Sequence, residues 1–156
     1  MDGEIKVTYF FEFEDDFVAS LRCIPMIVRY KLDTCGVKLK LAHWNQFPQT
    51  ERQILVEHPT TTPEEIQSYQ NLLRQFAEKY TDIPLKDLPI EENPAWLEIE
   101  NIPETVQQKA EEVGVQLTVQ HWQSLTPLQR FALIKLSRPS HENHNFLPAL
   151  KEFNLV

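Results

Sequence analysis

The residues with the clearest potential for chemistry are two histidines near the C-terminus and the only two cysteines. His141 and His144 are three residues apart, a spacing that on a helix lets both rings reach one metal ion. Cys23 and Cys35 would lie roughly 18 Å apart on one straight helix, too far for a disulfide, so we expect two reduced thiols. These four residues are the metal-ligand candidates. A polar loop before the last helix explains the histidines equally well, and we predict no bound metal and no cofactor.

The common catalytic motifs are missing from the sequence. It contains no GxGxxG, GxxxxGK[ST], HExxH, CxxC or GxSxG pattern. No spacing of its carboxylates singles out a general acid and a general base. We therefore expect a protein that is not an enzyme.

The overall charge limits the classes of partner. The 156 residues include 15 Lys and Arg against 23 Asp and Glu, a formal net charge of −8. A phosphate backbone repels such a chain, so we expect no nucleic-acid partner. No apolar run approaches the roughly 18–20 residues that span a bilayer, and the acidic start lacks the layout of a signal peptide. These features predict a cytoplasmic protein without a membrane segment.

Basic residues gather locally despite the acidic total. One stretch, residues 22–40, holds five basic residues and the single acid Asp33, and a second, residues 125–141, holds no acid. Opposite charges that are separated on a surface orient a charged partner during docking. The candidate partner-binding residues are Arg29, Lys31, Lys38, Lys40, Arg138, His141 and Glu142.

An internal repeat organises the chain. Ile24–His58 aligns without a gap to Ile102–Leu136, at an offset of 78 residues, with eleven of 35 positions identical. The identical pairs include Lys31/Lys109, Gly36/Gly114, His43/His121, Trp44/Trp122 and Arg52/Arg130. The offset is half the chain length, and a fixed period of this kind indicates repeated structural units. We predict a tandem duplication of a multi-helix unit with pseudo-two-fold symmetry.

The repeat sets the expected domain organisation. We predict a single domain, residues 1–156, made of two repeats at about 14–80 and 96–156. A Pro-rich, acidic linker at 81–95 joins them, because this stretch has no hydrophobic period and contains three prolines.

Turn and cap residues predict a mainly α fold. Thr62-Pro63 and Thr126-Pro127 pair an N-cap with a first-turn proline, and we expect the first of these helices to end near Tyr80. Residues 37–41 and 115–119 alternate apolar and polar side chains, which fits either a short strand or an extended link into a helix. The N-terminal alternation over residues 7–13 suggests one further strand. The fold class is therefore mainly α with, at most, a few short β segments.

The residues that both repeats share suit structural roles. We place Trp44 and Trp122 in the core and expect their neighbouring histidines to make hydrogen bonds. Arg52 and Arg130 are expected to face inward, as partners of either carboxylates or backbone carbonyls.

An ordered set of motifs resembles a known family. The motifs are FxFExDF at 11–17, LRCIPM at 21–26, RYKLDxCGVKL at 29–39, WN at 44–45, LQRFALxKLSRP at 128–139 and HExxNFLPALKEF at 141–153. Together they resemble the nitrate reductase-associated protein family of cyanobacteria and some other bacteria, over roughly Phe11 to Leu155. The resemblance implies a protein encoded with nitrate-assimilation genes and needed for active assimilatory nitrate reductase, a ferredoxin-dependent molybdenum and iron–sulfur enzyme. It brings no catalytic or cofactor residues.

The leading hypothesis is a non-enzymatic factor that binds nitrate reductase and supports its assembly, cofactor insertion or activity. One alternative is a metal or iron–sulfur carrier that uses Cys23, Cys35, His141 and His144. Another is an electron-transfer helper that docks ferredoxin on the basic stretches.

Overall fold

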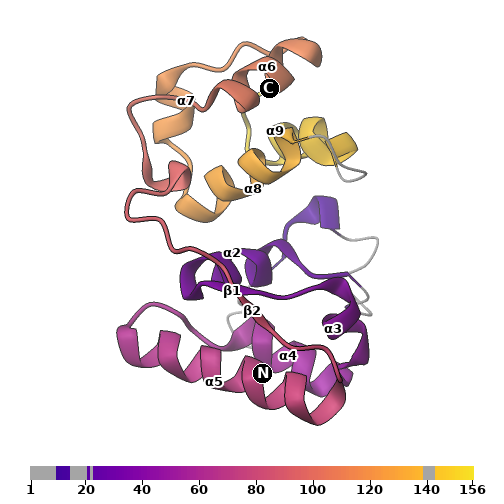
Figure 1. The fold of residues 1–156 in the computed structure, drawn as a ribbon. Coiled ribbons are helices and arrows are strands. Elements are labelled where there is room, and N and C mark those ends of the chain that lie inside the picture. Colours follow the sequence, from indigo (N-terminus) through magenta and orange to yellow (C-terminus); the bar gives the residue numbers. More distant parts are fainter. Residues whose placement is uncertain (1–9, 15–20, 22, 139–142) are drawn as a thin grey trace, which may run out of the picture. The chain divides into compact units, whose positions relative to one another are not determined.

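The fold was taken from a computed structural model that describes residues 10–14, 21, 23–138 and 143–156. The chain divides into two compact units, Met1–Ile90 and Glu91–Val156, called here the first and the second unit. The boundary falls inside the predicted linker. Figure 1 shows a mainly helical protein with one small two-stranded sheet, which confirms the expected fold class. The single domain, the duplication and its pseudo-two-fold symmetry stay predictions.

The first unit contains four helices, a short 3₁₀ turn and the sheet within its described residues. They are η1 (Glu12–Glu14), α2 (Met26–Cys35), β1 (Val37–Lys38), α3 (Leu41–Gln46), α4 (Gln49–Glu57), α5 (Pro63–Tyr80) and β2 (Lys86–Asp87). Helix α2 packs against α4 and α5, and α3 packs against α5. The predicted N-terminal strand is wrong at its described end, where η1 takes its place, and residues 7–9 lie outside the described residues.

The second unit repeats the order of helices without a described sheet. Its elements are η2 (Ala95–Leu97), α6 (Glu104–Glu112), α7 (Val119–Gln123), α8 (Pro127–Ser137), η3 (Asn143–Asn145) and α9 (Phe146–Glu152). Helix α8 is central, because it packs against η2, α6, η3 and α9.

The helix starts predicted at Thr62 and Thr126 are confirmed by side-chain caps, and Thr118 caps α7 in the same way. The hydroxyl oxygens of Thr62, Thr118 and Thr126 accept hydrogen bonds from the backbone N–H three residues later, at 3.1, 3.2 and 3.1 Å respectively. Each bond satisfies a donor that the first helical turn cannot pair internally. Helix α5 runs to Tyr80 as expected.

The two alternating segments have different structures. Both follow a glycine in the left-handed region, Gly36 at φ 72° and Gly114 at φ 78°, where a helix has just ended. After Gly36 the chain forms β1, which pairs antiparallel with β2. After Gly114 no strand is assigned, and the chain is an extended link into α7. Each alternative that the sequence offered is therefore realised once.

Strand β2 comes from the predicted linker. Lys86 and Asp87 pair with Lys38 and Val37, and the N–H of Leu88 donates to the carbonyl of Gly36 at 2.8 Å. The first part of the 81–95 stretch is thus paired with the first unit, although several of its side chains, including those of Asp82, Lys86 and Asp87, stay exposed.

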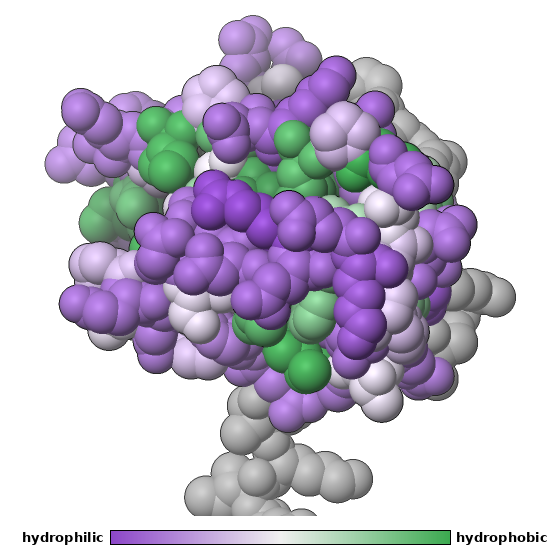
Figure 2. Space-filling view, turned by 60° about the horizontal axis from the view of Figure 1, so that its bottom comes forward, coloured by the Kyte–Doolittle hydropathy of each residue, from purple (hydrophilic) through white to green (hydrophobic). Residues whose placement is uncertain are grey.

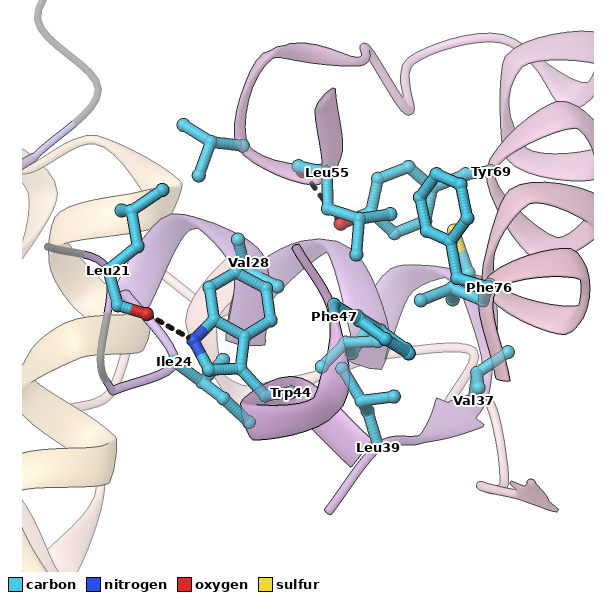
Figure 3. Packing of buried hydrophobic residues seen from close by; sticks show 14 residues of the cluster. Leu21, Ile24, Val28, Val37, Leu39, Trp44, Phe47, Leu55, Tyr69 and Phe76 are labelled. Carbon is cyan, nitrogen blue, oxygen red and sulfur yellow. Dashed lines mark hydrogen bonds between the residues drawn. The ribbon is translucent and has the colours of Figure 1, made fainter. Parts of the chain in front are cut away.

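Both predicted core tryptophans are buried, Trp44 with 0% and Trp122 with 1% of its surface exposed. Figure 3 shows the first core, where the indole of Trp44 lies beside Val28 and Ile24. The fully buried large side chains of the second unit include Phe131, Leu133, Leu136, Phe146 and Leu150. Among the described helices none is both long and apolar enough to cross a bilayer.

Candidate functional site

A tryptophan–arginine network forms in the first unit. The indole N–H of Trp44 donates to the carbonyl of Leu21 at 2.6 Å, and the Arg52 guanidinium donates to the same oxygen at 2.9 Å. Arg52 Nε also donates to the carbonyls of Trp44 and Phe47, at 3.1 and 3.0 Å. The arginine therefore binds the last turn of α3 to the chain segment that precedes α2.

The second unit forms the same network from the matched residues. The indole N–H of Trp122 donates to the carbonyl of Glu98 at 2.7 Å. Arg130 donates to Trp96, Trp122 and Leu125, at 2.7, 3.2 and 2.6 Å. The prediction that Arg52 and Arg130 face inward is confirmed, and their partners are backbone carbonyls. Both arginines therefore have a structural role.

His43 and His121 stabilise the starts of α3 and α7, in which each is the third residue. Nδ1 of His43 accepts from the N–H of Lys40 at 3.0 Å, and Nδ1 of His121 accepts from the N–H of Thr118 at 3.1 Å. Because its Nδ1 is an acceptor, neutral His43 has its proton on Nε2, which donates to the carbonyl of Ile83 at 3.1 Å. The predicted hydrogen-bonding role of both histidines is confirmed.

Lys31 is a buried cap on α4. Only 7% of its surface is exposed, and its ammonium donates to the carbonyls of Val56 and His58 at 2.6 and 2.7 Å. Burial lowers the pKa of Lys31 from 10.5 to about 8, while the nearby Cys35 and Glu57 oppose this shift. The prediction that Lys31 is a surface cation available to a partner is therefore wrong, because its charged end faces inward.

The cysteines differ in exposure. Cys23 is half-buried, whereas Cys35 is 1% exposed, and neither forms a disulfide. Burial raises the pKa of the Cys35 thiol to about 11, and the adjacent Lys31 opposes that shift. A thiol with so little thiolate at neutral pH is a poor nucleophile and a poor metal ligand.

The metal candidates do not come together in the part of the chain that the structure describes. Within those residues no group of three or more His, Cys, Asp and Glu side chains could hold an ion. His144 lies exposed in η3, and His141 and Glu142 lie outside the described residues.

The remaining basic residues among the partner-binding candidates are Arg29, Arg138, Lys38 and Lys40. Arg29 is half-buried and its Nε donates to the carbonyl of Ile24 at 3.2 Å, whereas Arg138 is exposed at the end of α8. Lys38 and Lys40 are both exposed, on and just after β1. The sheet brings a third lysine to them, because Lys86 pairs directly with Lys38. Sequence reasoning missed Lys86, since it lies in the stretch assigned to a linker.

A groove of about 440 Å³ lies between the C-terminal half of α5 and residues 81–87. Apolar side chains line part of it: Val37, Ala77, Ile83, Pro84 and Leu85. The polar side chain of Thr81 and five charged side chains complete the lining, the latter being Arg74, Glu78, Asp82, Lys86 and Asp87. Figure 2, which brings forward the side on which α5 lies in Figure 1, shows a largely hydrophilic surface with separate small hydrophobic areas. The alternating apolar pair Ile83 and Leu85 was the signal in the sequence that could have indicated this packing.

Comparison with known proteins identifies the family. The family model of the conserved nitrate reductase-associated protein matches residues 10–153, and therefore nearly the whole chain. No curated protein and no solved structure matched. The match confirms the resemblance seen in the motifs, and the chain belongs to the family of conserved nitrate reductase-associated proteins.

Proposed function

We propose that this protein is a non-enzymatic accessory factor of assimilatory nitrate reductase, and that it acts by binding the reductase during its maturation or its activity. The observation that carries the proposal is the family match over residues 10–153, whose description names an association with nitrate reductase. A match of this extent covers both units, so the proposed role belongs to the whole chain.

The potentially reactive side chains are held in structural hydrogen bonds, and this supports a role without catalysis. Lys31 caps α4, His43 joins α3 to the carbonyl of Ile83, and Arg52 and Arg130 are each bound to several carbonyls. The Cys35 thiol is buried with a raised pKa. Groups held in this way are poorly placed to meet a substrate, whereas the exposed surface is free to meet a protein.

The test is to produce nitrate reductase with and without this chain in the same host and to compare the purified enzymes. Specific activity, molybdenum and iron content, and direct binding of the purified chain are measured for both preparations. We expect lower activity in the enzyme made without the chain, together with measurable binding. A reductase that is fully active when made and assayed without the chain, and that does not bind it, would refute the proposal.

A second step separates maturation from activity. Purified chain is added to finished reductase that was made in its absence, with an unrelated acidic helical protein as the control. Recovery of activity on addition places the action on the finished enzyme. Recovery that needs co-production places it in maturation. Each result selects one half of the proposed role.

A further inference from the structure

Three lysines share the outer face of the small sheet. Lys38 and Lys86 are direct cross-strand partners, and residues paired in this way have their side chains on the same face. Lys40 follows Lys38 by two residues and so lies on the same side of the chain. All three are exposed. We call these three residues the lysine face.

The lysine face forms no ion pair within the described part of the chain: none of Lys38, Lys40 and Lys86 is paired with a described acid. The nearest acids belong to the groove that Lys86 also lines, namely Glu78, Asp82 and Asp87, and they lie near Lys86 without pairing with it. Like charges directly opposite each other destabilise a strand pair, so this arrangement disfavours the isolated fold. An anionic partner would turn the same arrangement into a favourable one.

The second unit shows that the backbone does not need these lysines. Gln116 and Thr118 occupy the positions of Lys38 and Lys40 in the aligned segment, and both segments lead into a helix whose third residue is a histidine that accepts from the backbone N–H before the helix. The second segment forms no strand, and Thr118 caps α7 through its hydroxyl. Neutral residues at these two positions therefore allow the helix start that follows, and the charges of Lys38 and Lys40 are not needed for it.

The lysine face is held in place by the sheet beneath it. The N–H of Leu88 donates to the carbonyl of Gly36 at 2.8 Å. A Cβ atom at Gly36 would lie 2.6 Å from the Ile90 side chain and 2.9 Å from the Leu88 carbonyl, so the two chain segments are in close contact. His43 adds its hydrogen bond to Ile83. A fixed backbone removes the backbone part of the entropy cost of binding, while each lysine side chain still loses rotamer freedom.

We infer that the lysine face, Lys38, Lys40 and Lys86, is the docking site for an acidic surface of the partner protein, which under the proposed function is nitrate reductase. The inference rests on the proposed function and adds to it where contact is made. The rest of this chain is acidic, with a formal net charge of −8 overall. Its net charge repels an acidic partner on average, so a local basic face orients the encounter as well as strengthening it.

The test compares two charge-matched variants for binding to purified nitrate reductase. The test variant is Lys38→Gln, Lys40→Gln and Lys86→Gln combined. The control variant is Lys79→Gln, Lys109→Gln and Lys151→Gln combined, at lysines on α5, α6 and α9. We expect the test variant to bind about tenfold more weakly at low salt, with the difference shrinking as salt rises, because exposed charge pairs are individually weak and screened. The control variant should bind like the wild-type protein.

The outcomes separate this inference from the proposed function. If the wild-type chain does not bind the reductase at all, the proposed function fails and the docking site fails with it. If the wild-type chain binds and the test variant binds equally well, the docking site is refuted while the proposed function stands. Equal weakening of the test and control variants shows an effect of net charge, which also refutes a local site.

A measurement on the wild-type chain guards against a folding defect in the variant. Carbodiimide joins lysines directly to carboxylates that are in contact, and the joined peptides are identified by mass spectrometry. Products that link Lys38, Lys40 or Lys86 to acids of the reductase support the inference. Products that map only to other lysines contradict it.

Discussion

Lys31 of the first unit and Lys109 of the second occupy the same position in the aligned repeat, yet their environments differ. Lys31 is buried and donates to two carbonyls at the end of α4. Lys109 is half-buried, with 20% of its side chain exposed, and forms an ion pair with Glu112 at 3.2 Å. The same residue is therefore a helix cap in one unit and the partner of a carboxylate in the other.

Other matched pairs follow the same division. His43 is buried and hydrogen-bonded at both ring nitrogens, whereas His121 is half-buried and, among the described residues, is hydrogen-bonded through Nδ1. Gly36 lies tightly under Leu88 and Ile90, whereas nothing lies within 4 Å of a Cβ placed at Gly114. The difference comes from residues 81–90, which cover this part of the first unit. Both units contain the tryptophan–arginine network. The first unit differs because residues 81–90 pack against it.

The largest expected loss of stability follows from substituting the arginines of the shared network. Arg130→Met leaves three carbonyls without their donor in a buried site, and we expect a loss of about 3–4 kcal/mol in the free energy of unfolding. Arg52→Met should cost about 2 kcal/mol, because Arg52 is half-buried and water can replace part of its contacts. Urea unfolding followed by tryptophan fluorescence measures both. Equal and small losses would contradict a structural role for the network.

The second prediction tests how tightly residues 81–90 pack against the first unit at Gly36. Gly36→Ala places a methyl group 2.6 Å from Ile90 at a φ of 72°, so we expect a loss of about 2–3 kcal/mol. Gly114→Ala meets the same backbone strain without a clash and should cost about 1 kcal/mol. The two variants are compared by urea midpoint under identical conditions. If Gly114→Ala costs as much stability as Gly36→Ala, backbone strain alone accounts for the loss, and the close packing at Gly36 contributes nothing.

Local features of this fold could be predicted from the sequence, because caps and turns depend on neighbouring residues. Thr62 and Thr126 cap helices as expected, and both repeat glycines follow helix ends in the left-handed region. The core tryptophans could be placed because their repetition pointed to packing. All these signals act over a few residues or within one repeat.

Long-range features could not be predicted. Strand β2 pairs with a strand almost fifty residues earlier, and two paired residues give no periodic pattern to read. The burial of Lys31 could not be predicted either, since the identical Lys109 has a different partner, the carboxylate of Glu112. The candidate surface could therefore be predicted at Lys38 and Lys40, but Lys86 joined it only through the sheet.

A smaller effect distinguishes the two matched lysines. Lys31→Met removes a donor from the carbonyls of Val56 and His58, and we expect a loss of about 1–2 kcal/mol at pH 7. Lys109→Met removes a surface ion pair and should cost less than about 0.5 kcal/mol. Urea unfolding of the two variants measures the difference. Equal costs would mean that the buried contacts of Lys31 contribute nothing.

The contribution of Lys31 should also depend on pH. Its pKa is lowered from 10.5 to about 8 in the folded protein, so the unfolded chain binds more protons between these values. Stability from this group therefore rises as pH increases from about 8 towards 10.5. The gap in unfolding free energy between wild type and Lys31→Met should widen by about 1–2 kcal/mol from pH 7.5 to 9.5. A constant gap would indicate that the ammonium is not desolvated.

The smallest effect replaces a residue of the first unit by its counterpart in the second. Cys35 aligns with Val113, and Cys35→Val exchanges a buried thiol for a side chain of similar size. A buried thiol packs as a small hydrophobe, so we expect a change of less than about 1 kcal/mol, and the Gln70 side chain keeps its hydrogen bond to the backbone carbonyl at this position. Binding to nitrate reductase and the activity of the reductase should be unchanged. Loss of either function with unfolding free energy preserved would mean that the Cys35 thiol performs chemistry, and the two units would then differ in function as well as in their surface.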